Sequence, residues 1–140
     1  MKRQIFFLEL ALMIIMTFTL SAQQRIVLAG RGANMLADAI YLFPDAGERL
    51  VAYSSGDQGL GLFMSAVDPA FKEKVCFDKS AGVEVIASFK PDLVILKSIA
   101  KSQYEAPLNA LGIRQLYLNL ETPEQYYEDI ATLSKVLGNQ

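Results

Sequence analysis

A helix that must stop, followed at once by a buried strand, constrains this chain most, and both lie within residues 82–96. Residues 83–89 carry apolar side chains at helical spacing, and Pro91 forces Lys90 out of the α conformation, so this helix must end there. The run Leu93–Leu96 that follows is apolar at every position. Such a run is typical of a strand buried on both faces, in a parallel sheet covered by helices on each side.

Strand and helix patterns alternate along the rest of the chain. Strands are predicted at Arg25–Leu28, Leu50–Tyr53, Leu93–Leu96 and Arg114–Leu118, and helices at 33–43, 83–89, 98–111 and from Thr122 onward. The last helix starts at a capping box, Thr122 to Gln125, with proline at its first position. Residues 63–81 give mixed signals, and the pattern predicts a turn at 68–69, a helical turn at 71–75 and a loop at 77–80. The chain is therefore predicted to be an α/β domain with a parallel four-stranded sheet flanked by helices.

Residues 1–22 have the three parts of a secretory signal peptide. Lys2 and Arg3 precede an apolar run at 5–20, and Ser21-Ala22 supplies small residues at a cleavage site before residue 23. The alternative is a single membrane anchor, although the run is shorter than the roughly 20 residues that a span prefers. We therefore expect a leader at 1–22 and an exported, periplasmic or extracytoplasmic, domain at 23–140.

Composition excludes several classes of function. The chain has 13 basic and 15 acidic side chains and a formal net charge of −2, which is not the profile of a nucleic-acid-binding domain. It has no histidine and one cysteine, so it has no Ser-His or Cys-His pair and lacks the usual ligand sets for zinc. No paired carboxylates stand at a spacing typical of hydrolases, so no catalytic residue is predicted. The apolar neighbours of Cys76 indicate a small side chain that is buried or half-buried.

A glycine-rich turn follows the first predicted strand. In the pattern G-x-G-x-x-G that begins at Gly30, the third glycine is replaced by Met35, and the second strand ends at Tyr53 without the carboxylate that would bind a ribose. The fingerprint of a dinucleotide site is thus incomplete. Two interpretations stay open, a plain tight turn or a turn that presents Arg31 at the carboxyl edge of the sheet, where ligands of open α/β folds bind.

Polar and aromatic side chains follow the carboxyl ends of three predicted strands. These candidate ligand-binding residues are Arg31, Tyr53, Asp57, Gln58 and Lys97. Parallel strands bring their carboxyl ends to one edge, so the loops are expected to form one rim. The two cations suit an anionic ligand, and the tyrosine offers a ring face with a hydroxyl. Each residue singly could equally be an ordinary solvated loop residue.

Four segments resemble, in order, the amino-terminal lobe of a family of transport proteins. They are RIVLAG, ERLVAYSS, VEVIASFKPDLVIL and LNALGIRQLYLNLETPEQYYEDIATLSKVLG. The family comprises the substrate-binding proteins of ABC transporters that capture ferric siderophores, haem or cobalamin. The resemblance implies a Rossmann-like lobe of a two-lobe protein, a non-enzymatic role, a metal-chelate or tetrapyrrole ligand, and delivery to a membrane permease. No cofactor of the protein's own is implied, since the metal would arrive within the ligand.

The resemblance also implies a docking residue and a missing half. In the family, an acidic residue at the start of the short helix before K-P-D-L-V meets arginines of the permease, and this position is Glu84 here. A first-turn carboxylate stabilised by the helix dipole is the structural alternative. The chain stops at Gln140, about where the connecting helix and second lobe would begin, so we expect a fragment that holds one lobe. The competing class is a small exported or membrane-tethered Rossmann-like domain with a nucleotide-dependent enzymatic or signalling role.

Overall fold

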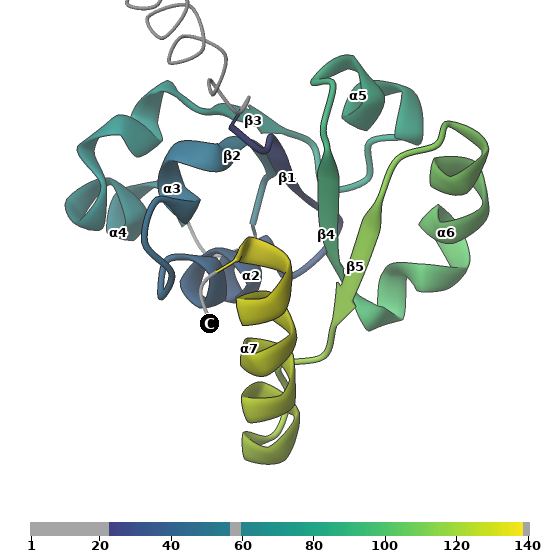
Figure 1. Ribbon diagram of the computed structural model, residues 1–140. Coiled ribbons are helices and arrows are strands. Elements are labelled where there is room, and N and C mark those ends of the chain that lie inside the picture. The colour runs from purple at the N-terminus through teal and green to yellow at the C-terminus, as the bar shows by residue number, and fades with distance from the viewer. Residues whose placement is uncertain (1–22, 57–59, 139–140) are drawn as a thin grey trace, which may run out of the picture.

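The computed structural model describes residues 23–56 and 60–138 (Figure 1). The predicted leader at 1–22 and the candidate residues Asp57 and Gln58 lie outside these ranges.

The centre of the fold is a parallel sheet of five strands (Figure 1). The strands are β1 (Ile26–Ala29), β2 (Leu50–Ser54), β3 (Val75–Phe77), β4 (Leu93–Lys97) and β5 (Gln115–Leu118). Their order across the sheet is β3-β2-β1-β4-β5, with every neighbouring pair parallel. The predicted α/β class with a parallel sheet is confirmed, and the sheet has five strands where four were predicted.

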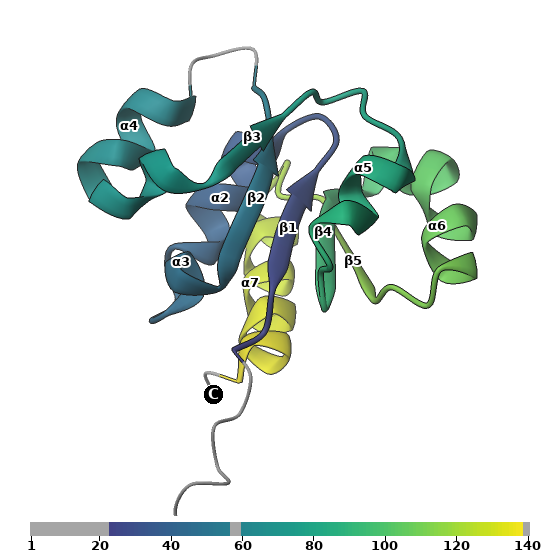
Figure 2. The same cartoon turned by 90° about the horizontal axis from the view of Figure 1, so that it is seen from above.

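Helices cover both faces of the sheet (Figure 2). They are α2 (Ala33–Ile40), α3 (Ala46–Arg49), α4 (Leu60–Val67), α5 (Val83–Ser88), α6 (Lys101–Ala110) and α7 (Pro123–Leu137), with 3₁₀ turns η1 (Pro69–Glu73) and η2 (Ser98–Ala100). Side chains from α2, α3, α4, η1 and α7 fill one core, and those from α5 and α6 fill the other. We call the first side of the sheet the α2/α7 face and the second the α5/α6 face. None of the helices in these ranges is long and apolar enough to cross a membrane.

The central strand β1 separates the two cores by simple alternation. Ile26 and Leu28 point to the α2/α7 face, Val27 and Ala29 point to the α5/α6 face, and all four are fully buried. Burying a branched aliphatic side chain contributes roughly 1.5 to 3 kcal/mol. This strand therefore anchors both layers and fixes where its carboxyl end lies.

The missed strand β3 lies at an edge of the sheet. It pairs only with β2, and its three residues are too few to show a period. Phe77 is buried whereas Val75 is 49 % exposed and Cys76 is also exposed. The prediction of a buried or half-buried cysteine is therefore wrong, because an edge strand leaves one side of its backbone and some of its side chains to solvent.

The predicted stop before Pro91 is confirmed, and two side chains reinforce it. Lys90 leaves the helical region with φ 51°, a left-handed conformation. The Arg25 guanidinium donates to the carbonyl oxygens of Phe89 (2.7 Å) and Lys90 (3.1 Å), so it covers the end of α5. The Asp92 carboxylate accepts from the Arg25 backbone N–H at 2.8 Å. The K-P-D stretch thus ties the end of α5 to the start of β1.

The predicted start of the last helix is also confirmed. The Thr122 hydroxyl oxygen accepts from the Gln125 N–H at 3.3 Å, and Pro123 is the first helical residue. At the other end Gly138 adopts φ 77°, which a glycine takes without steric cost. The helix runs from the carboxyl edge of the sheet back along the α2/α7 face (Figure 1).

Candidate ligand site at the carboxyl edge

The chain changes direction at the centre of the sheet, between β1 and β4. After β1 it passes through α2 on one face and turns toward β2, and after β4 it passes through α6 on the other face toward β5. The loops after these two strands therefore separate and leave a crevice at their carboxyl ends. Open α/β folds bind their ligands at such a switch point.

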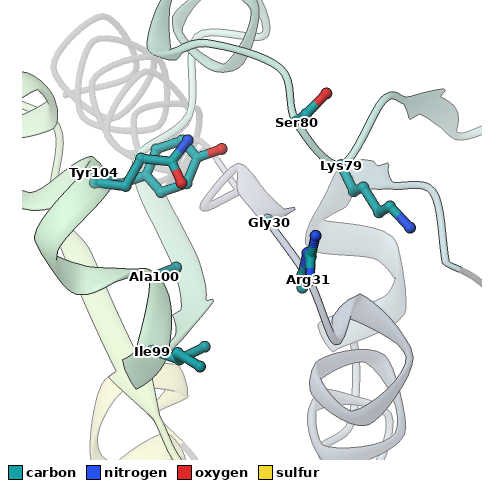
Figure 3. Close-up of a pocket in the computed structure, with 8 residues that line it drawn as sticks. Gly30, Arg31, Lys79, Ser80, Ile99, Ala100 and Tyr104 are labelled. Atoms are coloured by element: carbon teal, nitrogen blue, oxygen red, sulfur yellow. The ribbon is translucent and has the colours of Figure 1, made fainter.

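A hollow of about 350 Å³ occupies this position. Its lining residues come from the loop after β1, the loop after β3, and η2 with the start of α6: Gly30, Arg31, Lys79, Ser80, Ile99, Ala100, Gln103 and Tyr104. Arg31 and Lys79 lie on one side of it and Tyr104, Ala100 and Ile99 on the other (Figure 3). The volume is within the range of small-molecule sites.

The β1–α2 turn presents Arg31 through the conformation of its two glycines. Gly30 has φ 75° and Gly32 has φ 79°, both in the left-handed region that favours glycine. The Ser54 hydroxyl, fully buried at the end of β2, donates to the Gly30 carbonyl at 2.5 Å. Arg31 between the glycines is exposed, so its guanidinium is available to a ligand.

After the β1–α2 turn, the second wall of the hollow is the loop between β3 and α5. Hydrogen bonds to a carboxylate hold this loop in place. The Asp78 carboxylate accepts hydrogen bonds from the backbone N–H and the hydroxyl of Ser80, and these bonds hold the pKa of Asp78 below its usual range. The buried Tyr104 donates its hydroxyl to the Ala81 carbonyl at 3.0 Å, which fastens the loop to α6. Burial raises the pKa of Tyr104 above its ordinary value of 10.0, so the hydroxyl stays a donor even at mildly alkaline pH. Lys79 and Ser80 are thus held at the hollow by contacts on both sides.

The third wall is apolar and open. Ile99 in η2 is 85 % exposed, the highest value among the large apolar side chains in the described part of the chain. Ala100 follows it, and the edge of the Tyr104 ring completes this side of the hollow. A ligand with an apolar body would cover Ile99, and burying that side chain favours binding.

The charge of the lining is positive. Two of its eight described residues are basic and none is acidic. A group with negative charge, such as a carboxylate or phosphate, is the complement of Arg31 and Lys79.

The structure brings Arg31 to the hollow and directs two other predicted residues elsewhere. Tyr53 is 8 % exposed and its ring centre lies 4.5 Å from that of Phe71, in the core of the α2/α7 face. Burial, with a smaller effect from Cys76, raises the pKa of Tyr53. Lys97 is 5 % exposed, and its Nζ lies 2.6 Å from the Glu121 carboxylate.

The strand ends themselves meet at one edge, as expected for parallel strands. Ligand contact by any of the five candidate residues stays a prediction. Lys79, Ser80, Ile99, Gln103 and Tyr104 were not found from the sequence. A predicted strand at residues 75–77 would have placed Lys79 and Ser80 at this edge of the sheet. The sequence predicts a loop at 77–80 but no strand before it.

The glycine turn departs from a dinucleotide site in its packing as well as in its sequence. A Cβ placed on Gly32 would lie 3.0 Å from Cγ of Lys97, so the lysine stem covers the glycine on that side. In the dinucleotide fingerprint this glycine stays bare so that the pyrophosphate can approach the backbone. The position of the third glycine holds Met35, whose sulfur lies 4.0 Å from the Lys97 ammonium.

Glu84 lies in the first turn of α5 and is exposed. Its carboxylate folds back over Gly82, two residues earlier, where an added Cβ would lie 2.6 Å from Oε2 of Glu84. Both the docking role and the helix-dipole role are compatible with this position.

A scan against protein-family models and a search of curated proteins found no match to this chain.

Proposed function

We propose that this chain is the extracytoplasmic solute-binding component of an ABC uptake system. The observation that carries the proposal is the hollow at the switch point, with Arg31 and Lys79 on one side and the exposed Ile99 on the other (Figure 3). The resemblance of the K-P-D-L-V segment and its neighbours to binding proteins for metal chelates supports the same function. In this proposal the chain captures its ligand and performs no chemistry on it.

The charged side and the apolar side of the hollow indicate how a ligand would lie. An acidic group would meet Arg31 and Lys79, and an apolar body would rest on Ile99 and the edge of Tyr104 (Figure 3). A metal chelate or a tetrapyrrole with carboxylate groups has both parts. The metal would arrive inside the ligand, so the protein would need no metal ligands of its own.

Delivery requires a membrane partner, and Glu84 is the proposed contact. An exposed carboxylate on the first turn of α5 can accept a bidentate pair of hydrogen bonds from a permease arginine. The docking residue would then not be one of the residues that line the hollow. Ligand capture and delivery would therefore respond to different substitutions.

A nucleotide-dependent Rossmann-like domain is the second candidate. The strand order β3-β2-β1-β4-β5 is the order of the first five strands in dinucleotide-binding folds, and α2 begins directly at the glycine turn. The lysine stem over Gly32 and the methionine at position 35 count against it. A nucleotide that copurifies with the protein in stoichiometric amount would favour this candidate over ligand transport.

Titration with chelates tests the proposed function. We expect the purified mature protein to bind at least one of ferric citrate, hemin and cyanocobalamin, followed by tyrosine fluorescence or by the absorbance of the ligand. Arg31→Ala should weaken that binding by about 1 to 3 kcal/mol, the usual effect of removing a charged anchor.

The matched control is Lys135→Ala, which removes an exposed cation from α7, outside the hollow lining. It should leave the affinity unchanged. Failure of all three ligands to bind, or equal losses for both variants, would contradict capture at this hollow.

A further inference from the structure

Apart from tyrosines, two polar or charged side chains are buried in the part of the chain that the structure describes. Both contact the turn formed by residues 30–32. They are Ser54, fully buried, and Lys97, 5 % exposed. Ser54 donates its hydroxyl to the carbonyl of Gly30, and the Lys97 stem lies against Gly32. Burying a polar group costs free energy unless the group is paired. Two such groups at one turn therefore indicate that the conformation of this turn matters for the protein.

The contact between Lys97 and Gly32 is extended along the side chain. A Cβ on Gly32 would lie 3.0, 3.5 and 4.0 Å from Cγ, Cδ and Cε of Lys97. The methylene groups therefore run beside the glycine for the length of the side chain. An unbranched stem of this length supports the turn from the α2/α7 face, while Arg31 lines the hollow.

The far end of Lys97 is fastened to another loop. Its ammonium lies 2.6 Å from Oε1 of Glu121, whose side chain is 62 % exposed. Glu121 follows Leu120, which is held at φ 56° while its N–H donates to the Asp129 carboxylate at 2.9 Å. The lysine head is thus paired outside the hollow, with the loop before α7.

We infer that Lys97 and Ser54 are positioning residues, which hold the Gly30–Gly32 turn so that Arg31 faces the ligand. Lys97 acts through its stem, and Glu121 fixes the rotamer of that stem. Lys97 would therefore affect ligand binding indirectly, through the position of Arg31, and not by contact with the ligand. Its binding consequence rests on the proposed function, and its structural part does not.

The structural part is tested without any ligand, by hydrogen–deuterium exchange of the peptide that spans residues 29–36. Lys97→Ala should speed its exchange by about tenfold, because the support under Gly32 is lost. Lys97→Met keeps an unbranched stem of similar length, so exchange should stay within about twofold of wild type. Ser54→Ala should also accelerate this peptide, and Ser54→Thr, which restores the hydroxyl, should reverse the effect.

Two controls separate a local effect from a general loss of stability. The peptide that covers β5 (Gln115–Leu118), which contains none of the substituted residues, should be unchanged in each variant. Lys101→Met removes an exposed ion pair with Glu105 on α6, 3.3 Å long, and should leave the turn unchanged. Unaltered exchange of the turn in Lys97→Ala, or equal acceleration of the turn and β5, would overturn the inference.

The binding part uses hemin as the probe. Lys97→Met should bind within about twofold of wild type, whereas Lys97→Ala should lose a large part of what Arg31→Ala loses. The double variant Arg31→Ala/Lys97→Ala should lose no more than Arg31→Ala alone, because Lys97 acts through Arg31. If Lys97→Met loses as much as Arg31→Ala while turn exchange is normal, Lys97 contacts the ligand and the inference is wrong. If wild type does not bind hemin, that result counts against the proposed function, and the exchange data still decide the inference.

Discussion

At the scale of single residues, a carboxylate joins segments that are far apart in the sequence. The Tyr41 hydroxyl donates to Asp68 Oδ2 at 2.7 Å, and the Lys74 ammonium lies 3.9 Å from the same oxygen. Lys74 also donates to the Gly47 carbonyl at 2.6 Å. The end of α2, the start of η1 and the helix before β2 are thereby held together beside the aromatic core.

The Tyr41 hydroxyl gives this cluster a pH dependence. Burial, followed by the hydrogen bond and the charge of Asp68, raises the pKa of Tyr41 above its ordinary value of 10.0. In the unfolded chain the phenol releases its proton near the ordinary value, so the unfolded state binds fewer protons above that pH. The contribution of Tyr41 is complete below about pH 10 and is lost as pH rises toward the folded-state pKa.

We therefore expect Tyr41→Phe to lower the free energy of unfolding at pH 7 and to flatten its decline above pH 10. Urea unfolding at pH 7, 9, 10 and 11 measures both effects. Tyr127→Phe is the control, because this tyrosine is 75 % exposed. A decline above pH 10 that is equally steep in wild type and Tyr41→Phe would show that other groups cause it.

At the scale of elements, the loop between β5 and α7 depends on one helical side chain. The Asp129 carboxylate accepts from the backbone N–H groups of Asn119 (2.7 Å) and Leu120 (2.9 Å). Leu120 is buried and has φ 56°, an unfavourable conformation for a leucine that persists only when its surroundings hold it. Asp129 thus fixes the entry into α7 and, through Glu121, the loop that pairs with Lys97.

Asp129→Ala should destabilise the protein by about 2 to 4 kcal/mol, since two partly buried N–H groups lose a charged acceptor. Asp129→Asn keeps one carbonyl acceptor and should cost less than half as much. Thermal or urea unfolding measures both, and Glu128→Ala on the exposed neighbouring position is the control. Equal stabilities of wild type and Asp129→Ala would mean that the loop geometry does not depend on this carboxylate.

Elements governed by neighbouring residues were predictable, and the orientation of site residues was not. The stop at Pro91 and the cap at Thr122 depend on residues within a few positions, so the sequence alone locates them. Tyr53 depends instead on a register shift between β1 and β2, where Val27 pairs with Ala52 although Ile26 pairs with Leu50. The extra residue reverses the side to which Tyr53 points, so it packs on Phe71 and not toward the hollow.

Lys97 illustrates a different limit. Alternation along β4 places it on the same side as Leu93 and Ile95, which the sequence does indicate. Which side of the sheet holds the hollow depends on the path of the chain through β3, and that strand was missed. The loop with Lys79 and Ser80 was therefore absent from the predicted site.

At the scale of the whole molecule, the proposed function requires export. The charged start and apolar run of residues 1–22 lead us to expect cleavage before Gln23. Intact-mass measurement of the protein from the cell envelope fraction should give a mature amino terminus at or near Gln23. A soluble cytosolic protein that retains Met1 would contradict both export and a role in uptake.

In the proposed function, delivery is the step at which the whole molecule would meet its partner, and substitution of Glu84 tests this step. The carboxylate is exposed on the first turn of α5, so replacing it disturbs no packed core. Glu84→Lys would set like charges against a permease arginine and should weaken the complex by about 2 to 5 kcal/mol. Uptake of the labelled chelate by cells should fall sharply, while the affinity of the purified protein for that chelate stays unchanged.

The control for charge reversal is Glu128→Lys, an exposed position on α7, across the sheet from α5. It alters net charge by the same amount and should leave uptake intact. Persistent uptake in Glu84→Lys cells would limit this carboxylate to a helix-terminus charge. A parallel fall in solution affinity would instead assign Glu84 to the ligand site, because docking alone leaves the free protein's binding equilibrium untouched.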